Sequence, residues 1–447
     1  MPIFTVLARS VLYAVAFAML PLAVVVAQLA LPAARGPDRH EEVLVPPELS
    51  VPDPARPTAV FLVGNHGTEV TDLLPPFAAI AGSSAFNVVT VAPSRQASPL
   101  LDAGIRATGL SLMPDYSLDE FDAAFPWAPA LVVVPYIPAF DREDRALVSW
   151  LRDRAGPQTV ILTICAGTTL AAETGLMEGA RATSHFRFLD GLRARHPGVN
   201  WQEGVRYVAD DRFITSGALL AGVDAALVAV HRIAGAEALQ RAAAAIRADA
   251  RLAADPRALA PSPRNVRTWL HDVFGPHAGE IGLRLSEGAD EMMVAAVADM
   301  LGVSVRSTVR TFADHPGPVR TRFGLTLLPE LTGIEPARFS AVFESVPEGG
   351  DPIPAFEMVL DWIAAAQGTF PARRAAERFA LPSPFEPADG TTGDGRALIV
   401  LVLLGGAGVL AFGIADRVWR RRQMSRMIDG KGIVARTSAT VRTVQEA

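Results

Sequence analysis

Residues 159–169 read Thr-Val-Ile-Leu-Thr-Ile-Cys-Ala-Gly-Thr-Thr and contain the only cysteine of the chain, Cys165. The apolar and β-branched run at 159–164 is typical of a parallel strand that is buried on both faces. A helix can begin directly after Cys165, so the thiol is predicted at the apex of a strand, a sharp turn and a helix. The free N–H groups of a helix N-terminus would stabilise a thiolate and an oxyanion. Cys165 is therefore a candidate nucleophile, and the alternative is an inert core cysteine.

Strands and helices alternate on both sides of this segment. The pattern predicts strands at 59–63, 87–92, 110–113 and 130–134, and helices through 73–80 and at 142–154 and 223–252. Alternation of this kind is typical of a parallel sheet covered by helices. We expect a flavodoxin-like α/β sandwich whose cysteine elbow lies at the carboxyl end of the sheet, where ligands of such sheets bind.

A partial internal repeat follows this first unit. Thr-Gly-Leu-Ser-Leu-Met-Pro-Asp at 108–115 is echoed by Phe-Gly-Leu-Thr-Leu-Leu-Pro-Glu at 323–330. The flanking strands and helices are echoed in the same order by strands at 281–285 and 339–347 and a helix at 355–366. The second copy stops before any equivalent of Cys165. It is interpreted as a degenerate, catalytically empty repeat of the same unit.

Two long uncharged segments predict one or two transmembrane helices. Residues 10–34 are 25 consecutive uncharged residues and residues 397–415 are 19 more, and each can cross a hydrocarbon core of about 30 Å. The first segment is either a membrane anchor or a cleaved signal sequence. The tail after residue 415 holds eight basic and three acidic residues, which the positive-inside rule places in the cytoplasm. Residues 36–396 are then expected on the periplasmic or extracellular side of the cell (inner) membrane.

These observations give a complete predicted domain organisation. It comprises an anchor or signal sequence (1–35), a linker (36–57), the main α/β domain (58–255), a linker (256–265), the partial repeat (266–387), a linker (388–396), a transmembrane helix (397–415) and a basic cytoplasmic tail (416–447).

Composition excludes several kinds of chemistry and of partner. Lys431 is the only lysine, so Schiff-base and P-loop lysine mechanisms have no candidate in the main domain. A single cysteine excludes an intramolecular disulfide and Cys-rich metal centres, and the histidines show no metal spacing, so we expect neither metal nor cofactor. The net charge of −6 includes a tail of +5, which leaves −11 on the remainder and argues against nucleic acid as a partner.

Several motifs resemble the ThiJ/PfpI family of the class I glutamine amidotransferase-like superfamily. They are Ile-Cys-Ala-Gly at 164–167, Ala-Thr-Ser-His at 182–185, Phe-Ile-Thr-Ser-Gly at 213–217 and Gly-Val-Asp at 222–224. The resemblance covers about residues 58–255. It is strongest to the branch that includes isonitrile hydratases and the sensor domains of AraC-type regulators. No DNA-binding module follows the domain here.

The resemblance implies roles for individual residues. Cys165 matches the elbow cysteine, and Asp72, which stands four residues before Pro76, matches the acid beside it, with Glu69 as the alternative. His185 matches the histidine near the family's pocket. The backbone at Ala166 and Gly167 would form the oxyanion or binding site.

Departures from the family pattern limit what the resemblance implies. Ala166 replaces the histidine that follows the cysteine in protease-like members, and no late His-x-Glu pair supplies a glutaminase triad. Pro135 and Pro138 stand where many members carry a Gly-Gly pair whose N–H groups form an oxyanion hole, and proline has no N–H to donate.

Three functions follow as alternatives. The first is a cysteine-dependent hydrolase, hydratase or lyase that acts on a small molecule on the exported side of the membrane. The second is a non-catalytic ligand-binding domain tethered to the membrane, and the third is a redox sensor in which Cys165 is oxidised reversibly. Family members commonly dimerise, so we expect either a homodimer or an internal pseudo-dimer formed with the second repeat.

Overall fold

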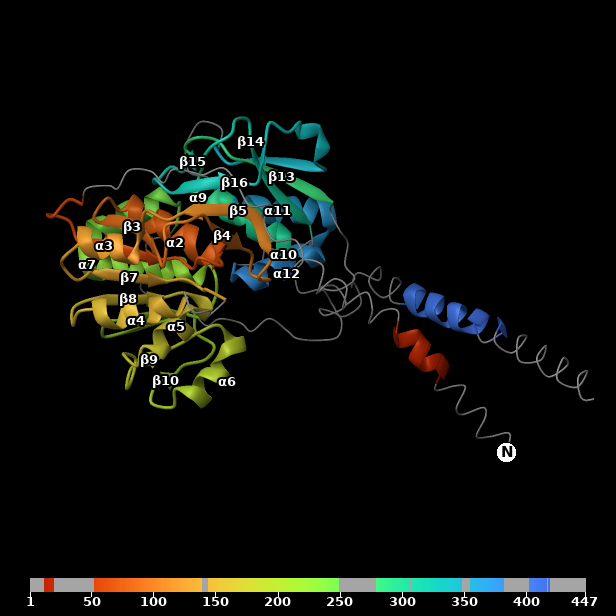
Figure 1. Cartoon of the computed structure of the whole chain (residues 1–447), viewed down its shortest axis with the longest axis horizontal. Helices are drawn as coiled ribbons and strands as arrows, with labels where there is room; N and C mark the ends of the chain where they lie inside the picture. Colours follow the sequence, from red (N-terminus) through yellow and green to blue (C-terminus); the bar gives the residue numbers. More distant parts are fainter. Residues whose placement is uncertain are drawn as a thin grey trace, which may run out of the picture. The chain divides into compact units, whose positions relative to one another are not determined.

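The computed structural model describes residues 12–19, 52–138, 144–248, 279–304, 307–347, 354–381, 402–415 and 417–418. The chain divides into two compact units (Figure 1). One unit combines residues 1–34 with residues 394–447, and the other comprises residues 35–393. The second unit holds the sheets and Cys165.

The main sheet has seven strands in the order β11-β12-β8-β7-β1-β3-β6. All neighbouring pairs are parallel except β11 with β12. The central strands consist of Val, Ile, Leu, Phe, Thr and Ala and are buried on both faces, which confirms the predicted flavodoxin-like parallel sheet. The strands are β1 (Thr58–Leu62), β3 (Asn87–Ala92), β6 (Tyr116–Ser117), β7 (Leu131–Val134), β8 (Val160–Thr163), β11 (Tyr207–Asp210) and β12 (Phe213–Ser216).

Different helices cover the two faces of this sheet, because successive residues of a strand point to opposite sides. Ala59 and Phe61 of β1 belong to one core with helices α2 (Val70–Gly82) and α7 (Ala221–Ala245). Val60 and Leu62 belong to the other core. That core includes α3 (Leu118–Ala124), α4 (Asp144–Arg154), α5 (Thr168–Glu173) and α6 (Phe186–Arg195), with the short strands β9 (Arg181–Ala182) and β10 (Asn200–Trp201) beside them.

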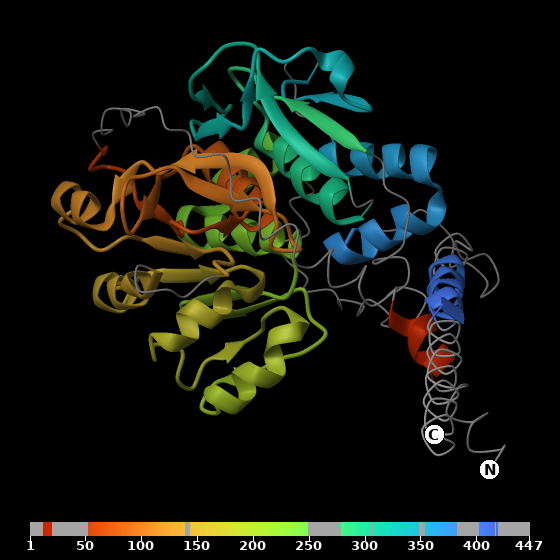
Figure 2. The same cartoon turned by 45° about the vertical axis from the view of Figure 1, so that its right-hand side comes forward.

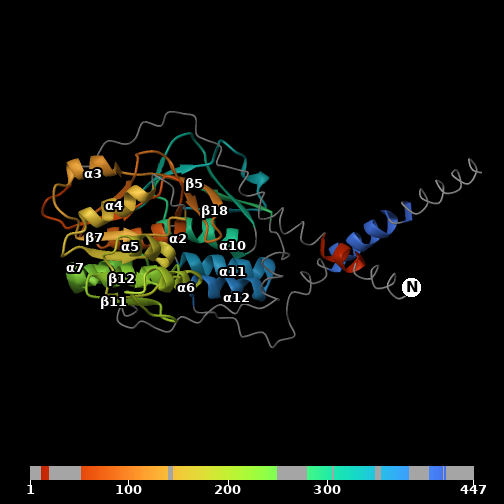
Figure 3. The same cartoon turned by 60° about the horizontal axis from the view of Figure 1, so that its bottom comes forward.

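A second, four-stranded parallel sheet follows in the order β17-β14-β13-β18 (Figure 2). Its strands are β13 (Glu280–Arg284), β14 (Thr308–Ala313), β17 (Leu331–Thr332) and β18 (Ala341–Glu344). Its helices are α9 (Glu291–Ala295), the π-helical turn η3 (Ala296–Leu301), α10 (Gly302–Ser304), α11 (Ala355–Gln367) and α12 (Thr369–Phe379), with a 3-10 turn η4 (Pro336–Arg338). Helices α11 and α12 pack side by side (Figure 3). The strand order follows that of β6-β3-β1-β7 in the main sheet, and descent of this half from a duplication stays a prediction.

A third sheet joins the two halves in the order β15-β16-β5-β4-β2. Its strands are β2 (Thr68–Glu69), β4 (Ser98–Leu101), β5 (Ala107–Met113), β15 (Val319–Arg320) and β16 (Thr326–Pro329). The predicted strand at 110–113 is therefore confirmed as part of β5, but it lies outside the main sheet. Strands β5 and β16, which carry the repeated motif, pair antiparallel with Leu112 opposite Leu327.

The terminal unit contains helical residues 12–19 and 402–415. Tyr13 packs edge-on against Phe412, with ring centroids 5.2 Å apart. Within the part of the chain that the structure describes, no helix has both the length and the apolar character that a membrane span requires. The rest of the predicted spans lies outside the described residues, as do the linkers 256–265 and 388–396, most of the linker 36–57 and nearly all of the tail 416–447.

Candidate active site

Cys165 occupies a strained turn directly after β8. Its φ of 54° lies in the left-handed region, which costs a non-glycine residue roughly 1–3 kcal/mol and is common at functional sites. The next residues form a 3-10 turn, Cys165–Gly167, that continues into α5. Gly167 is required there, because a Cβ would lie 2.1 Å from the carbonyl oxygen of Val134. The predicted elbow of strand, turn and helix is confirmed.

Hydrogen bonds from two neighbouring segments hold this elbow in place. The carbonyl oxygen of Cys165 accepts from the Ser184 hydroxyl at 3.0 Å and from the His185 N–H at 3.3 Å. The backbone N–H of Cys165 donates to the Ser216 hydroxyl at 3.4 Å. The motifs at 182–185 and 213–217 therefore position the cysteine through its backbone.

Glu69 and Asp72 both lie beside the elbow, at the start of α2. Glu69 caps this helix by accepting a hydrogen bond from the Asp72 N–H. Asp72 accepts at 3.0 Å from the N–H of Tyr136. Both side chains are buried, and both act electrostatically on the Cys165 thiol, Asp72 more strongly than Glu69. Both predicted carboxyls are therefore brought to the cysteine.

Burial raises the pKa of both carboxyl groups. It raises the pKa of Asp72 to about 8, although the hydrogen bonds from Tyr136 and Glu69 act in the opposite direction. Burial and the neighbouring carboxyls raise the pKa of Glu69 well above its usual value. At neutral pH, Asp72 is consequently an acid that can donate a proton.

Cys165 is held as a thiol rather than as a thiolate. Burial raises its pKa well above the ordinary value, and the charges of Asp72 and Glu69 raise it further, whereas the Ala166 N–H lowers it. The helix N-terminus was expected to favour a thiolate, whereas burial acts in the opposite direction, because desolvation raises the pKa of the thiol.

The two residues predicted to form the oxyanion site behave differently. The Ala166 N–H interacts with the Cys165 side chain. The Gly167 N–H instead donates to the carbonyl oxygen of Ile164 at 2.8 Å. Its predicted role as an oxyanion donor is therefore not met, because the turn itself uses its only N–H.

His185 is adjacent to Cys165 through the backbone, whereas its ring takes part in capping α6. Nδ1 accepts from the Arg187 N–H at 3.4 Å, and the ring packs 4.4 Å from the ring of Phe186. Burial, the carboxyls of Asp72, Glu69 and Asp299, and the Ala166 N–H all act on the pKa of Cys165. The structure thus assigns His185 an architectural contact, and its predicted catalytic role stays a prediction.

Tyr136 is a site residue that the sequence analysis missed. Its N–H donates to Asp72, its carbonyl accepts from the Glu69 N–H at 2.9 Å, and its ring packs 5.5 Å from the ring of Phe188. Burial raises the pKa of its hydroxyl, and Cys165 and Asp72 raise it further, which places the phenol near both groups. Its position between Pro135 and Pro138 was the available signal, since Tyr136 keeps the N–H that each of the two prolines lacks.

Among residues that the structure describes, no group of three or more His, Cys, Asp or Glu side chains is arranged to hold a metal ion.

The chain is similar to several known proteins. Residues 57–231 match the DJ-1/PfpI family. An isonitrile hydratase from Pseudomonas putida is 28% identical over 98 residues, which are 22% of this chain and 42% of the hydratase, so the match spans less than half of that relative. A ThiJ/PfpI family protein from Pseudomonas syringae has a TM-score of 0.36 at 21% identity and covers 47% of this chain and 80% of its own.

Two further solved structures match at similar levels. Drosophila melanogaster DJ-1beta has a TM-score of 0.36 at 18% identity, covering 43% of this chain and 99% of its own. An AraC family transcriptional regulator from Pseudomonas putida has a TM-score of 0.35 at 12% identity, covering 42% and 97% respectively. Residues 57–231 of this protein are a DJ-1/PfpI (ThiJ) family domain.

Proposed function

We propose that this protein is a cysteine-dependent hydratase that adds water to a small, neutral electrophile, with an isonitrile as the model substrate. The observation that carries the proposal is a buried, neutral thiol next to a carboxylic acid whose pKa is raised to about 8. Such a pair suits an addition in which the attacked carbon also needs a proton. The similarity to an isonitrile hydratase supports the same class of substrate.

The reaction can be written with these residues alone. The Cys165 sulfur bonds to the terminal carbon of the isonitrile, and the same carbon receives one proton, delivered by Asp72, which regains it from the thiol. The product is a thioimidate, S–CH=N–R. Water then adds to its carbon, the C–S bond breaks, and the sulfur recovers its proton as an N-substituted formamide leaves. The sum is one isonitrile plus one water giving one formamide.

The remaining groups have supporting roles in this scheme. The phenol of Tyr136, which lies near Cys165 and Asp72, would donate a hydrogen bond to the substrate nitrogen as charge develops on it. The Ala166 N–H would stabilise the sulfur when it becomes the leaving group. Neither role needs the glycine-pair oxyanion hole that Pro135 and Pro138 replace.

The alternatives are supported by different observations. A non-catalytic binding domain is favoured by the occupied N–H of Gly167 and by the two prolines, since both remove oxyanion donors. Redox sensing is disfavoured because sulfenic acid forms from the thiolate, whereas Cys165 is buried and its pKa is raised.

The proposal predicts that the full-length protein converts alkyl isonitriles to formamides and that Cys165→Ala abolishes this activity. Formamide production, followed by NMR or chromatography, should fall on the order of 10³-fold or more, since the nucleophile cannot be replaced. Cys165→Ser is the matched polar control and should be equally inactive. If neither wild type nor variant turns over, yet an isonitrile raises the melting temperature of both, the protein is a binding module instead.

We also propose, on sequence grounds, that the protein is attached to the inner membrane with residues 36–396 on the exported side. Exposed apolar side chains of the terminal unit, among them Leu12, Leu403, Leu410 and Ile414, are compatible with a lipid environment. The full chain should remain in the membrane fraction after alkaline carbonate washing. A chain without residues 397–447 should be released if the first segment is cleaved and retained if it is an anchor. Recovery of the full chain in the wash would contradict the proposal.

A further inference from the structure

Strands β5 and β16 carry the repeated sequence motif, and they pair with each other in a symmetric register. Leu112 and Leu327 are the fifth residues of the two motifs, and they lie directly opposite each other. The pairs on either side are Ser111 with Leu328 and Met113 with Thr326. Each of these pairs joins the fourth position of the motif in one strand to the sixth position in the other. Reciprocal pairing of this kind is typical of an isologous interface with a two-fold axis, which here lies between Leu112 and Leu327.

The neighbouring strands continue this symmetry. Strand β4 pairs antiparallel with β5, and β15 pairs antiparallel with β16, so the order β15-β16-β5-β4 is the same from either end. Ser98 of β4 lies opposite Leu112. Val319 of β15 lies opposite Leu327 in the same way. Both the order and the register of the strands therefore repeat on the two sides of the axis.

Helix α9 of the second half begins as α2 does, but with different chemistry. Glu69 caps α2 by accepting from the N–H three residues further on, and Asp290 caps α9 in the same manner. The N–H of each cap donates to a backbone carbonyl that follows a strand, β7 in the first half and β18 in the second. Met293 stands at the position of Asp72, and the only cysteine of the chain belongs to the first half. The second half thus keeps the backbone framework of the site without its thiol and its second acid.

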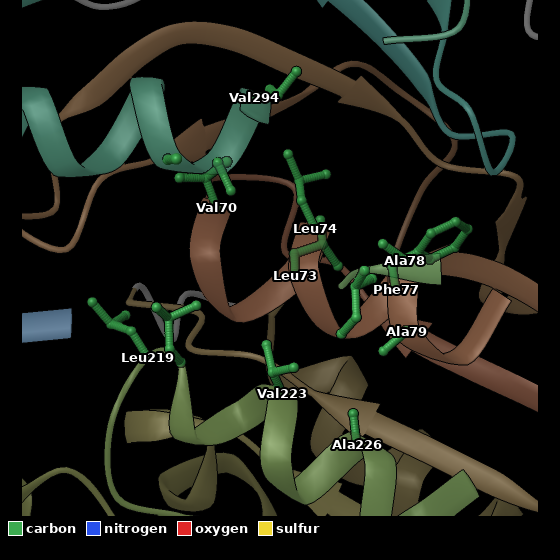
Figure 4. Packing of buried hydrophobic residues seen from close by; sticks show 14 of the residues in the cluster. Val70, Leu73, Leu74, Phe77, Ala78, Ala79, Leu219, Val223, Ala226 and Val294 are labelled. Atoms are coloured by element: carbon green, nitrogen blue, oxygen red, sulfur yellow. The ribbon is translucent and has the colours of Figure 1, made fainter. Parts of the chain in front are cut away.

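The two corresponding helices pack against each other. Helix α2 lies between α7 and the segment formed by α9 and η3 (Figure 4). Val294 of α9 lies beside Val70 and Leu74 of α2, and all three side chains are fully buried. Asp299 of η3 adds a polar contact, because it accepts from the Thr71 hydroxyl at 2.6 Å. The face of α2 that is turned away from α7 is therefore covered by the second half.

We propose that the second half is a built-in partner, which covers the edge of β5 and the face of α2 in place of a second copy of this chain. The two halves then form a pseudo-dimer within one chain, with one thiol site for two domains. A second copy has no edge of β5 to pair with, because β4 and β16 occupy both edges. The contacts at the axis do not include Cys165 or Asp72, so the pseudo-dimer is independent of the proposed hydratase activity.

Disulfide cross-linking distinguishes pairing within one chain from pairing between two copies. All variants are full-length chains purified in detergent, and all carry Cys165→Ser, so the introduced cysteines are the only ones. Residues opposite each other in an antiparallel pair lie about 4.5–5.5 Å apart, which a disulfide can span. Leu112→Cys combined with Leu327→Cys should therefore lose both free thiols on mild oxidation and still migrate as a single chain in non-reducing electrophoresis. A covalent dimer from this variant would show that two copies exchange their second halves, and would overturn the proposal.

The single variants test the homodimer directly. In a homodimer formed through β5, the symmetric register would place two copies of Leu112 opposite each other. Leu112→Cys alone would then be cross-linked into a dimer. In the pseudo-dimer its thiol faces Leu327, so the variant should stay monomeric with a free thiol, and Leu327→Cys alone should behave in the same way. A disulfide-linked dimer of Leu112→Cys would overturn the proposal.

Two further pairs of cysteines control for folding and for register. Ser111→Cys with Leu328→Cys leaves both axial leucines in place, and it should form the same disulfide within one chain. Leu110→Cys with Leu327→Cys is the matched control, because diagonal neighbours lie about 7–8 Å apart, which is too far for a disulfide. Both of its thiols should remain free. Free thiols in both directly opposite pairs, or a control that is oxidised as completely as they are, would overturn the symmetric pairing.

Discussion

Asp72→Asn is expected to lower the kcat of isonitrile hydration by about 10²- to 10⁴-fold, which is the usual contribution of a positioned general acid. Asparagine can still accept the hydrogen bond from the Tyr136 N–H, so the local geometry should survive. What it cannot do is deliver a proton to the attacked carbon. The measurement is steady-state formamide production, with alkylation of Cys165 as the check that the thiol remains in place.

The pH dependence of the wild type follows from the same carboxyl group. Asp72 is raised to a pKa of about 8, so it carries its proton below that pH and loses it above. Turnover that depends on the protonated acid should therefore be present at neutral pH and fall as the pH rises through about 8. The residual activity of Asp72→Asn should lack this fall.

Glu69→Gln distinguishes the two acids that the sequence leaves as alternatives. Glutamine can still cap α2 through its carbonyl oxygen, and Glu69 acts less strongly on Cys165 than Asp72 does. We expect its kcat to fall by no more than about tenfold. If Glu69→Gln abolishes turnover while Asp72→Asn does not, the proton donor is Glu69.

Sequence patterns predicted the scaffold of this site well, because local chemistry determines it. Buried strands are recognisable from runs of β-branched and apolar residues, as at 87–92, which is the exact extent of β3. The cysteine elbow was predictable because Cys165 stands directly between a buried strand and a turn made of small residues, Ala166 and Gly167. The residues of the first repeated motif were recognisable as a strand. Their antiparallel pairing with β16 was not.

The electrostatics of the site could not be derived in the same way. A helix N-terminus lowers the pKa of a nearby thiol and so predicts a thiolate. Burial instead raises the pKa of Cys165. How deeply the thiol is buried depends on how α2 packs between two other helices. Asp299 is far along the chain from Glu69, and no local pattern marks it. Tyr136 was overlooked because the flanking prolines were assessed for the N–H groups they lack, whereas the N–H between them is the one that Asp72 accepts.

Deleting residues 261–385 is expected to leave an insoluble or unfolded chain. The deletion exposes Val70 and Leu74 of α2, which are now fully buried, and removes β16 from the edge of β5. Each large apolar side chain that is returned to water costs about 1.5–3 kcal/mol, so a few of them match the roughly 5–15 kcal/mol that stabilise a typical domain. An unpaired β5 would also offer an open edge for aggregation. Solubility and circular dichroism measure the outcome.

A point variant tests the same interface in the intact chain. Leu327 has no exposed surface and pairs with Leu112 across the junction of β16 and β5. Leu327→Asp buries an unpaired charge there, so the free energy of unfolding should fall by about 3 kcal/mol or more in urea titrations. Thr332→Asp, at an exposed position on β17, is the matched control and should change it by about 0.5 kcal/mol or less. A soluble, monomeric deletion product that unfolds in one cooperative transition would show that the main domain does not need the second half.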